Sequence, residues 1–259
     1  MVTKVKEIIE YRDMIASLVK RELRGRYQKS FFGMLWTLIN PLFQIAIYTF
    51  VFMVVMKSNI ENYYVYLTAG MIPWSFFSDA VIQGTSIINN NSDMTKKIYF
   101  PREVLPIASA TAKLVNMLFA FVIVFAFIII GGAGINPKVI WLLPIIWVQE
   151  YVLVLGFTLI FSAIAVYVKD MEYIVGVVMM AWIWGTPVMY ELSFLPPKVA
   201  KLLYANPMTL VTMTYHDVLY YQVMPSAKVM LVVTLEALVL LVVGEMIFSH
   251  LEGGFAEEM

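Results

Sequence analysis

The chain has no cysteine and only two histidines, His216 and His250, among its 259 residues. The missing cysteines exclude disulfides, thiolate metal sites and cysteine nucleophiles. The two histidines stand in different parts of the chain, so they form no spaced pair of metal ligands. A lone histidine is more often an ordinary surface residue than a ligand. We therefore expect no metal site in this chain.

Motifs of nucleotide and hydrolase chemistry are also missing. No G-x-x-x-x-G-K-[ST] loop occurs, so the chain has no phosphate-binding loop of its own. Neither the H-E-x-x-H pattern of zinc peptidases nor the G-x-S-x-G elbow of serine hydrolases is present. An enzymatic function has no motif behind it, and we predict neither a catalytic residue nor a cofactor bound by this chain.

Charge is scarce: 14% of the residues are charged, whereas 61% are hydrophobic. A typical soluble domain has about 25% charged and about 45–50% apolar residues. A water-soluble fold cannot hide so much apolar surface, but a bilayer can accept it. The composition therefore predicts an all-α integral membrane protein. The first residues lack the apolar core of a cleavable signal peptide, so we expect insertion to rely on the spans themselves.

Six apolar stretches are long enough to cross a hydrocarbon core of about 30 Å as helices. The second is the weakest because it holds Asp79 and Gln83. We predict six transmembrane helices in one domain, residues 1–259. The stretches lie at residues 31–56, 64–89, 105–131, 139–168, 172–190 and 229–249.

Residues 3–24 have the period of an amphipathic helix and not of a span. Polar residues such as Lys6, Asp13 and Lys20 recur on one side, and apolar residues fill the other. Basic residues on the polar face suit the headgroup region on the cytoplasmic side of a membrane. We predict an interfacial helix, with a solvated helix on a soluble partner as the alternative.

Lysine and arginine favour a cytoplasmic N-terminus. With that orientation the inside segments hold 12 of these residues and the outside segments 5, with Lys113 inside a span. Most of the bias comes from the N-terminal segment. Six spans then return the C-terminus to the cytoplasm.

Two connections are longer than turns. The cytoplasmic one, residues 90–104, has a polar start and a Phe100-Pro101 pair, which suit a short surface helix. The external one, residues 191–228, is divided by prolines into two pieces long enough for short helices. Its apolar residues predict that these helices lie on or dip into the outer leaflet, and a solvated loop is the alternative.

Charged residues inside spans are costly, about 2.5–3.5 kcal/mol each, and usually face protein or water. They suit either a proton or ion relay, or structural pairing such as Lys113 with a carboxylate. Glu245 and Lys113 are close enough to the cytoplasmic face to extend toward it, whereas Glu150 and Glu236 are deeper. The candidates are Asp79, Lys113, Glu150, Glu236 and Glu245.

Aromatic residues are abundant, with 15 Tyr, 17 Phe and 6 Trp. Many of the tyrosines and tryptophans stand near span ends, which is the aromatic belt of any membrane protein. Tyr48 and Trp184 lie inside spans, where the belt explanation is weaker. Rings with polar tips can pack on the C–H faces of sugars and bond to sugar hydroxyls. Composition alone does not select a sugar as the ligand.

Residues 21–52, RELRGRYQKSFFGMLWTLINPLFQIAIYTFVF, resemble the start of the first span in bacterial polysaccharide-export permeases. These are the membrane subunits of the second type of ABC exporter. The family pattern is a basic helix, an R-Y-x-x-S-x-x-G turn, a tryptophan three residues on and a proline in the first span. Here the matching residues are Arg26, Tyr27, Ser30, Gly33, Trp36 and Pro41.

Three further segments carry the same likeness in the same order. KKIYFPREVLPIA (96–108) resembles the family's segment between spans 2 and 3. VYVKDMEYI (166–174) resembles its short turn between spans 4 and 5, with Lys169 in place of the usual arginine. ANPMTLV (205–211) resembles its N-P-[ML] element before the last span. The likeness is greatest to O-antigen lipopolysaccharide exporters, with teichoic-acid and capsule exporters close behind.

The resemblance implies a homodimeric permease with a pore between the subunits. Two copies of a separate ATP-binding subunit would dock from the cytoplasm and bind the ATP and magnesium. The substrate would be a lipid-linked polysaccharide that crosses the bacterial inner membrane, with both termini of this chain in the cytoplasm. No nucleic acid is implied as a partner.

The resemblance also implies roles for particular residues. The external helices of 191–228 would narrow the exit. Segment 90–104 would couple to the ATP-binding subunit, through Tyr99, Phe100, Pro101, Arg102 and Glu103. The end of the interfacial helix would be a second contact or a lipid-headgroup site, through Lys20, Arg21, Arg24 and Arg26. The residues expected to line the pore or contact substrate are Tyr48, Trp184, Tyr190, Tyr204 and Tyr215.

Three other functions remain open from the residues alone. An exporter of drugs or small lipids in the same ABC class would differ in its substrate dependence. A proton-coupled secondary transporter using Glu150 and Glu236 would work without any ATPase. A membrane enzyme acting on lipid-linked sugar would form product by itself.

Overall fold

The computed structural model describes residues 2–25, 31–132 and 134–258, and in these ranges it contains helices and no strand. Arg26, Tyr27 and Ser30 of the predicted motif lie outside the described residues. The helices are α1 (Val2–Glu10), α2 (Arg12–Gly25), α3 (Trp36–Phe50), α4 (Tyr63–Thr85), α5 (Ile87–Asn90), α6 (Ser92–Lys97), α7 (Val104–Ile130), α8 (Pro137–Ile140), α9 (Leu143–Tyr167), α10 (Met171–Trp182), α11 (Pro197–Leu203), α12 (Pro207–Tyr215), α13 (Ala227–Leu251) and α14 (Phe255–Glu258).

Five helical segments among the described residues are long and apolar enough to cross a membrane, and a sixth is shorter. The sixth runs from Met171 to Gly185, whereas the sequence predicted a span to residue 190. It ends early because Pro187 disfavours helical backbone at Thr186, which is extended (φ −124°, ψ 133°). The all-α, multi-span fold class is confirmed. The five long segments are Trp36–Val55, Tyr63–Thr85, Val104–Ile130, Pro137–Tyr167 and Ala227–Gly254.

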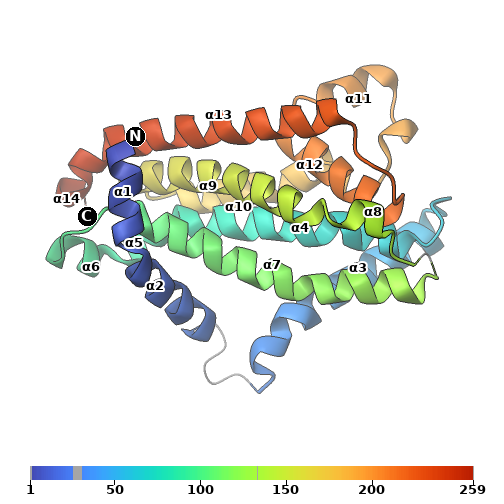
Figure 1. Cartoon of the computed structure of the whole chain (residues 1–259), viewed down its shortest axis with the longest axis horizontal. Helices are drawn as coiled ribbons and strands as arrows, with labels where there is room; N and C mark the ends of the chain where they lie inside the picture. Colours follow the sequence, from blue (N-terminus) through green and yellow to red (C-terminus); the bar gives the residue numbers. More distant parts are fainter. Residues whose placement is uncertain (1, 26–30, 133, 259) are drawn as a thin grey trace.

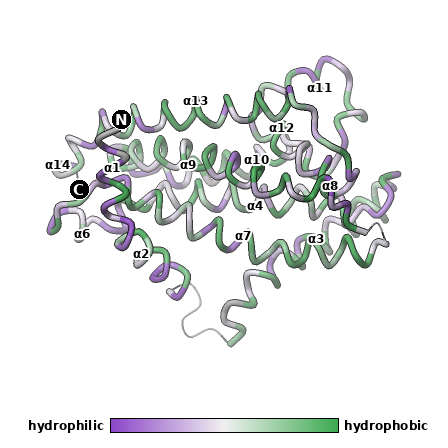
Figure 2. Tube along the Cα trace, viewed as in Figure 1, coloured by the Kyte–Doolittle hydropathy of each residue, from purple (hydrophilic) through white to green (hydrophobic). Residues whose placement is uncertain are grey.

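Helix α4 is the central helix of the bundle (Figure 1). In the most apolar stretch of α4, 78% of the residues are buried. In the corresponding stretch of the first long segment, which begins with α3, 6% are buried. Helix α4 packs against α3, α7, α9, α10 and α12. Hydrophilic residues gather at the two ends of the bundle, and apolar residues follow the long helices between them (Figure 2). The outer face of α3 is therefore left for lipid or another protein to cover.

Helices α9 and α13 approach each other at a pair of glycines. A Cβ atom on Gly244 would lie 2.5 Å from the carbonyl oxygen of Gly156. A Cβ atom on Gly156 would in turn lie 2.6 Å from the carbonyl carbon of Leu240. Small residues at a contact allow helix backbones to come this close inside a membrane. The two glycines therefore set the spacing between α9 and α13.

The N-terminal segment forms two helices where the sequence predicted one helix over 3–24. The break falls at Tyr11, whose N–H donates to the carbonyl groups of Glu7 (3.3 Å) and Ile8 (3.2 Å). The two helices are held by different parts of the bundle. Helix α1 is held through Lys4, which contacts Glu245 and Glu252 near the end of the chain. Helix α2 packs along α7.

Both chain ends lie at one end of the bundle, together with α1, α6 and α14 (Figure 1). Helices α8 and α11 lie at the opposite end. An even number of crossings between the two ends of the chain, as predicted for six spans, produces this arrangement.

The two short helices predicted between the last two spans are α11 and α12. Helix α11 is exposed, whereas most of α12 is buried among α4, α9 and α13. Asn206 begins α12: its Oδ1 accepts from the N–H of Met208, and its Nδ2 donates to the carbonyl of Gly185. Helix α12 thus enters the bundle and packs against protein, whereas the sequence predicted that it lies on or dips into the outer leaflet.

His216 follows α12 and is buried, although a lone histidine was expected at the surface. Its ring stacks on Tyr66 with centroids 3.9 Å apart, and its Nε2 lies 3.1 Å from the Tyr66 carbonyl oxygen. Burial lowers the pKa of His216 to about 3. The imidazole is therefore neutral at physiological pH and packs as part of the core. The expectation was wrong because α12 enters the bundle.

Tyr215 ties α12 to α9. It is fully buried, and its hydroxyl donates to Oε2 of Glu150 at 2.6 Å. Tyr215→Phe should lower the free energy of unfolding by about 1–3 kcal/mol, because a buried acceptor loses its donor. Thermal unfolding of the purified chain in detergent measures this effect. Tyr173→Phe, at an exposed tyrosine of α10, should leave stability unchanged; equal losses from both variants would contradict the prediction.

Candidate functional site

The segment between α6 and α7 has an exposed face and a buried face. Its backbone is extended at Ile98 (φ −127°, ψ 133°), where helix α6 ends. Tyr99 is 87% exposed, and Ile98 is exposed beside it. Phe100 is only 5% exposed. Of the five residues assigned to this segment, Tyr99 alone presents a large apolar side chain outward.

Phe100 fastens the segment to the N-terminal helices. It packs in a small core with Leu18 of α2 and with Val104, Leu105 and Ala108 of α7. Fully burying a phenylalanine stabilises by about 1.5–3 kcal/mol. Phe100 therefore packs the segment against both α2 and α7.

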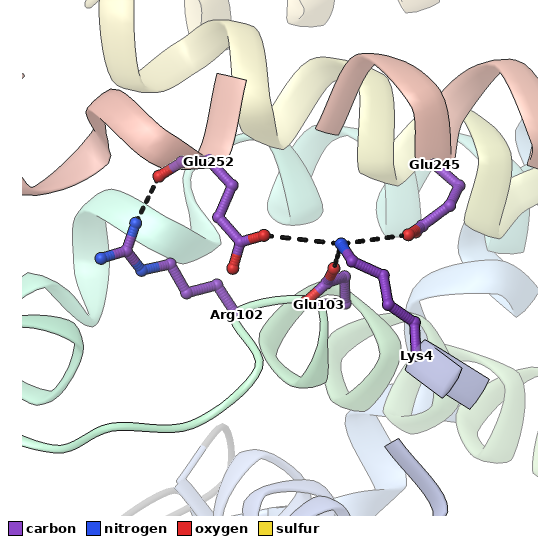
Figure 3. Close-up of polar contacts among 5 residues, drawn as sticks. All are labelled: Lys4, Arg102, Glu103, Glu245 and Glu252. Atoms are coloured by element: carbon purple, nitrogen blue, oxygen red, sulfur yellow. Dashed lines mark hydrogen bonds and ion pairs between the residues drawn. The ribbon is translucent and has the colours of Figure 1, made fainter. Parts of the chain in front are cut away.

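Lys4 joins three parts of the chain at this end (Figure 3). Its ammonium group donates to Glu103 at the start of α7, which is buried. The same nitrogen lies 3.3 Å from Oε1 of Glu245 and 3.5 Å from Oε2 of Glu252. Burial alone lowers the pKa of Lys4, but the hydrogen bond to Glu103 and the three carboxylates more than offset it. The net shift raises the pKa, so Lys4 stays charged.

Arg102 ties the same segment to the C-terminal helix. Its guanidinium donates to the carbonyl oxygen of Glu252 at 2.5 Å and lies 5.5 Å from the ring centroid of Phe255. The first contact satisfies a carbonyl near the end of α13, and the second is a cation–π arrangement. The start of α7 is therefore connected to both ends of the chain, through Glu103 to the N-terminal helix α1 and through Arg102 to the C-terminal segment.

A cavity of about 450 Å³ opens among these elements. Its wall combines charged groups with the aromatic pair Tyr99 and Phe100. The cavity lies at the end of the bundle that carries both termini, beside the exposed face of the segment. Its other lining residues are Lys4, Glu7, Ile8, Thr95, Ile98, Pro101, Arg102, Glu103, Ser249, Glu252 and Gly253.

The basic residues assigned to the interfacial helix lie on its exposed side. Lys20, Arg21 and Arg24 are exposed, and Arg21 donates to Oδ1 of Asn91 at 2.7 Å, next to α6. Arg26 lies outside the described residues. The N-terminal helices and the segment of residues 90–104 thus form one surface.

The five aromatic residues assigned to substrate come from separate elements. Trp184 and Tyr204 are exposed, and Tyr48 is half-buried on α3. Tyr190 is half-buried, and its hydroxyl donates to the carbonyl oxygen of Trp184 at 2.8 Å. Tyr215 is enclosed within the chain and bonded to Glu150, so in this conformation its side chain has no access to a substrate.

Sequence reasoning missed Lys4 and Glu252 as members of the site. Glu245 was expected to extend toward the cytoplasmic face, but its partner was not identified. Glu245 and Glu252 stand seven residues apart, which places them on one face of a continuous helix. That spacing was the only local signal, because Lys4 is 99 residues from Glu103 along the chain.

Residues 14–220 match the ABC-2 type transporter family, and this range covers most of the chain. The chain therefore belongs to the ABC-2 type transporter family. It is a multi-pass membrane permease, and the prediction that it lacks an ATPase domain of its own is confirmed. ATP binding in such systems belongs to a separate subunit, so an ATPase partner is implied.

Individual relatives agree with this class. The chain is 33% identical to the O-antigen export system permease protein RfbA of Myxococcus xanthus, over the full length of both. It is 28% identical to the RfbA protein of Klebsiella pneumoniae, over 95% of this chain and 94% of the relative. It is 23% identical to the polysialic acid transport protein KpsM of Escherichia coli, over 75% of this chain and 76% of that one.

Proposed function

We propose that this chain is the membrane subunit of an ATP-driven exporter of lipid-linked, O-antigen-like polysaccharide in a bacterial inner membrane. The observation that carries the proposal is the full-length similarity to an O-antigen export permease. The more distant match to a polysialic acid transport protein supports polysaccharide as the class of substrate. An exporter of drugs or small lipids is the rival within the same family.

The working assembly in this proposal is a homodimer with two ATP-binding subunits, which bind ATP and magnesium. The nearly uncovered first span supports a second copy, because only 6% of its most apolar stretch is buried within the single chain. The excess of lysine and arginine near the N-terminus supports a cytoplasmic location for that end. Both termini would then be cytoplasmic, since they lie at the same end of the bundle.

Residues 90–104 are proposed as the coupling segment, with a division of roles within it. Ile98 and Tyr99 would contact the ATP-binding subunit, because their side chains point outward. Phe100, Arg102 and Glu103 would pass the motion on, because they are held by the bundle. Pro101 would keep the segment extended. Lys20, Arg21, Arg24 and Arg26 would meet the same subunit or anionic headgroups.

The proposed conduit lies between the two copies. Trp184 and Tyr204 are exposed at the end opposite the coupling segment, and Tyr190 is bonded to Trp184. Rings and hydroxyls offer a sliding polymer many weak contacts, and tight sites would hold it. The segment of residues 191–228 would narrow the exit. A proton relay through Glu150 is not supported, because Glu150 is fully buried and its Oε2 accepts a hydrogen bond from the Tyr215 hydroxyl within the core.

Deleting the gene for this chain tests the function directly. Surface polysaccharide should disappear, and lipid-linked polysaccharide should accumulate inside the membrane. Expression of the native chain together with its ATP-binding subunit should restore export. Unchanged surface polysaccharide in the deletion strain, or restoration by the chain without any ATPase, would contradict the proposal.

Tyr99→Ala should reduce docking of the ATP-binding subunit, because an exposed aromatic at the centre of a contact supplies a large share of its binding energy. A loss of about 2 kcal/mol corresponds to roughly thirtyfold weaker association. Copurification of the ATP-binding subunit at several concentrations measures it. Phe194→Ala, at an exposed aromatic of the opposite end, is the control. Docking equally strong in both variants would rule out the proposed contact.

A further inference from the structure

A groove of about 280 Å³ lies between α3, α4 and α7, apart from the coupling segment. It is lined on α7 by Lys113 and Asn116, which are nearer the end of that helix at which the coupling segment joins it. Such a groove in membrane-spanning helices is normally apolar. This one is rich in amides and charged groups. Its remaining lining residues are Trp36, Thr37, Asn40, Pro41, Gln44, Ile72, Ser75, Phe76, Asp79, Met117 and Ala120.

The polar residues of α3 share one face of the helix. Thr37, Asn40 and Gln44 follow one another at three and four residues, so they stack along the groove. Asn40 and Gln44 are exposed in the single chain. Amides facing hydrocarbon would leave their donors and acceptors unsatisfied, which is costly. This face of α3 therefore meets water, protein or a polar ligand.

A charged pair lies across the groove from α3. Nζ of Lys113 is 3.9 Å from Oδ2 of Asp79, which confirms the predicted pairing of Lys113 with a carboxylate. The Lys113 side chain is 5% exposed, whereas that of Asp79 is 52% exposed. A half-exposed carboxylate in a span usually faces water or protein. The pair makes the groove polar while leaving its net charge at zero.

Asn116 adds an acceptor that the described residues do not satisfy. Its Oδ1 atom is buried and has no hydrogen-bond partner among them. Buried acceptors without donors are rare in folded proteins and are commonly met by a ligand or a water. A hydroxyl group entering the groove can supply the missing donor.

The chemistry of the lining selects a neutral, hydroxyl-bearing ligand. Amides both donate hydrogen bonds to hydroxyl groups and accept them, and the carboxylate accepts hydrogen bonds from hydroxyl groups. Trp36 at the wall supplies a partly exposed ring on which C–H faces can pack. A phosphate fits less well, because Lys113 already has Asp79 as its counter-ion and the phosphate would be repelled by that carboxylate.

We propose that this groove is a sugar-binding site that holds a neutral glycosyl unit of the lipid-linked substrate inside the membrane. The inference rests on the proposed function, since it assigns a site to part of that substrate. Its place beside the nearly uncovered α3 lets a glycan reach it sideways from the region between two copies of the chain. The lipid would stay in the bilayer while the sugar occupies the polar wall.

The absence of cysteine makes a site-specific test possible. Gln44→Cys gives a chain with a single thiol, to which a short photo-crosslinker is attached. Phe43→Cys is the matched control: it lies on the same helix, is exposed and does not line the groove. The probes are radiolabelled lipid-linked glycan and polyprenyl phosphate without sugar, each added to the complex with its ATP-binding subunit.

The glycan probe should label position 44 at least about tenfold more than position 43, and polyprenyl phosphate should label neither position preferentially. Asn116→Leu in the Gln44→Cys background should reduce the labelling about tenfold, because the ligand loses a hydrogen-bond partner. Leu118→Val, on an exposed part of α7, should leave it unchanged. These results would support a sugar site.

Other outcomes overturn the inference. Equal labelling by polyprenyl phosphate would indicate a lipid-phosphate site, and a cross-link from position 44 to a second copy of the chain would indicate an interface. If the Gln44→Cys chain exports polysaccharide normally but is not labelled by the glycan, the groove is not a sugar-binding site. The proposed function is then unaffected. If the native chain exports no polysaccharide, both proposals fail.

Discussion

Gly244→Ala should separate α13 from α9 and strongly destabilise the chain. The added methyl group would lie 2.5 Å from the carbonyl oxygen of Gly156 and 3.2 Å from its Cα. These are backbone atoms, so no side-chain rotation can relieve the contact and one helix must move. Overpacking of this kind costs about 1–3 kcal/mol and sometimes more. The melting temperature in detergent and the yield of monodisperse protein measure the effect.

Gly176→Ala is the matched control, because outside the adjacent backbone of its own helix no atom lies within 4 Å of the position that its Cβ would take. It should be neutral or slightly stabilising, since alanine favours helix over glycine by about 1 kcal/mol. Gly156→Ala should resemble Gly244→Ala, because its Cβ would meet the backbone of Leu240 at 2.6 Å. If Gly244→Ala and Gly176→Ala melt alike, the close approach of α9 and α13 does not exist.

The spans could be predicted from the sequence because length and hydropathy act locally. Each long apolar stretch must become a helix to satisfy its own backbone in a bilayer. The early end of the fifth span also has a local cause, since Pro187 makes the preceding backbone extended. The break at Tyr11 has no such signal. It depends on what α1 and α2 contact, and those contacts come from distant segments.

The candidate site was only partly predictable for the same reason. The resemblance identified Phe100, Arg102 and Glu103, but not the direction in which their side chains point. Phe100 points inward because Leu18 of α2 covers it, and nothing in residues 90–104 specifies that partner. The burial of α12 is a similar case. Its apolar residues predicted contact with the membrane, whereas the hydrogen bond from Tyr215 to Glu150 depends on a residue of α9.

Lys4→Met should uncouple ATP hydrolysis from export. Methionine keeps most of the length of the side chain but leaves Glu103, a buried carboxylate, without its cationic partner. A buried charge that loses its partner is strongly destabilising; because the Lys4 side chain is 34% exposed, we expect about 1–3 kcal/mol. The contacts that Lys4 makes with the start of α7 and with the end of α13 are lost together. Export per ATP hydrolysed by the reconstituted complex measures the coupling.

The controls separate charge pairing from general damage. Lys6→Met removes an exposed lysine of the same helix and should leave coupling unchanged. Adding Glu103→Gln to Lys4→Met should recover part of the stability, because the uncompensated buried charge is then gone. Export should stay low in that double variant, since the link between α1 and α7 is still missing. Full coupling in Lys4→Met would show that the cluster does not transmit motion.

The pH dependence of the native chain follows from the same cluster. The folded-state pKa of Lys4 is raised above the value of about 10.4 that lysine has in an unfolded chain. Because this pKa is raised in the folded state, the stability that Lys4 contributes is fully present below about pH 10. It is lost as the pH rises through the folded-state pKa. Neutral and mildly alkaline buffers should therefore leave the difference between the native chain and Lys4→Met unchanged. A difference that vanished between pH 7 and pH 9 would contradict the pairing of Lys4 with the three carboxylates.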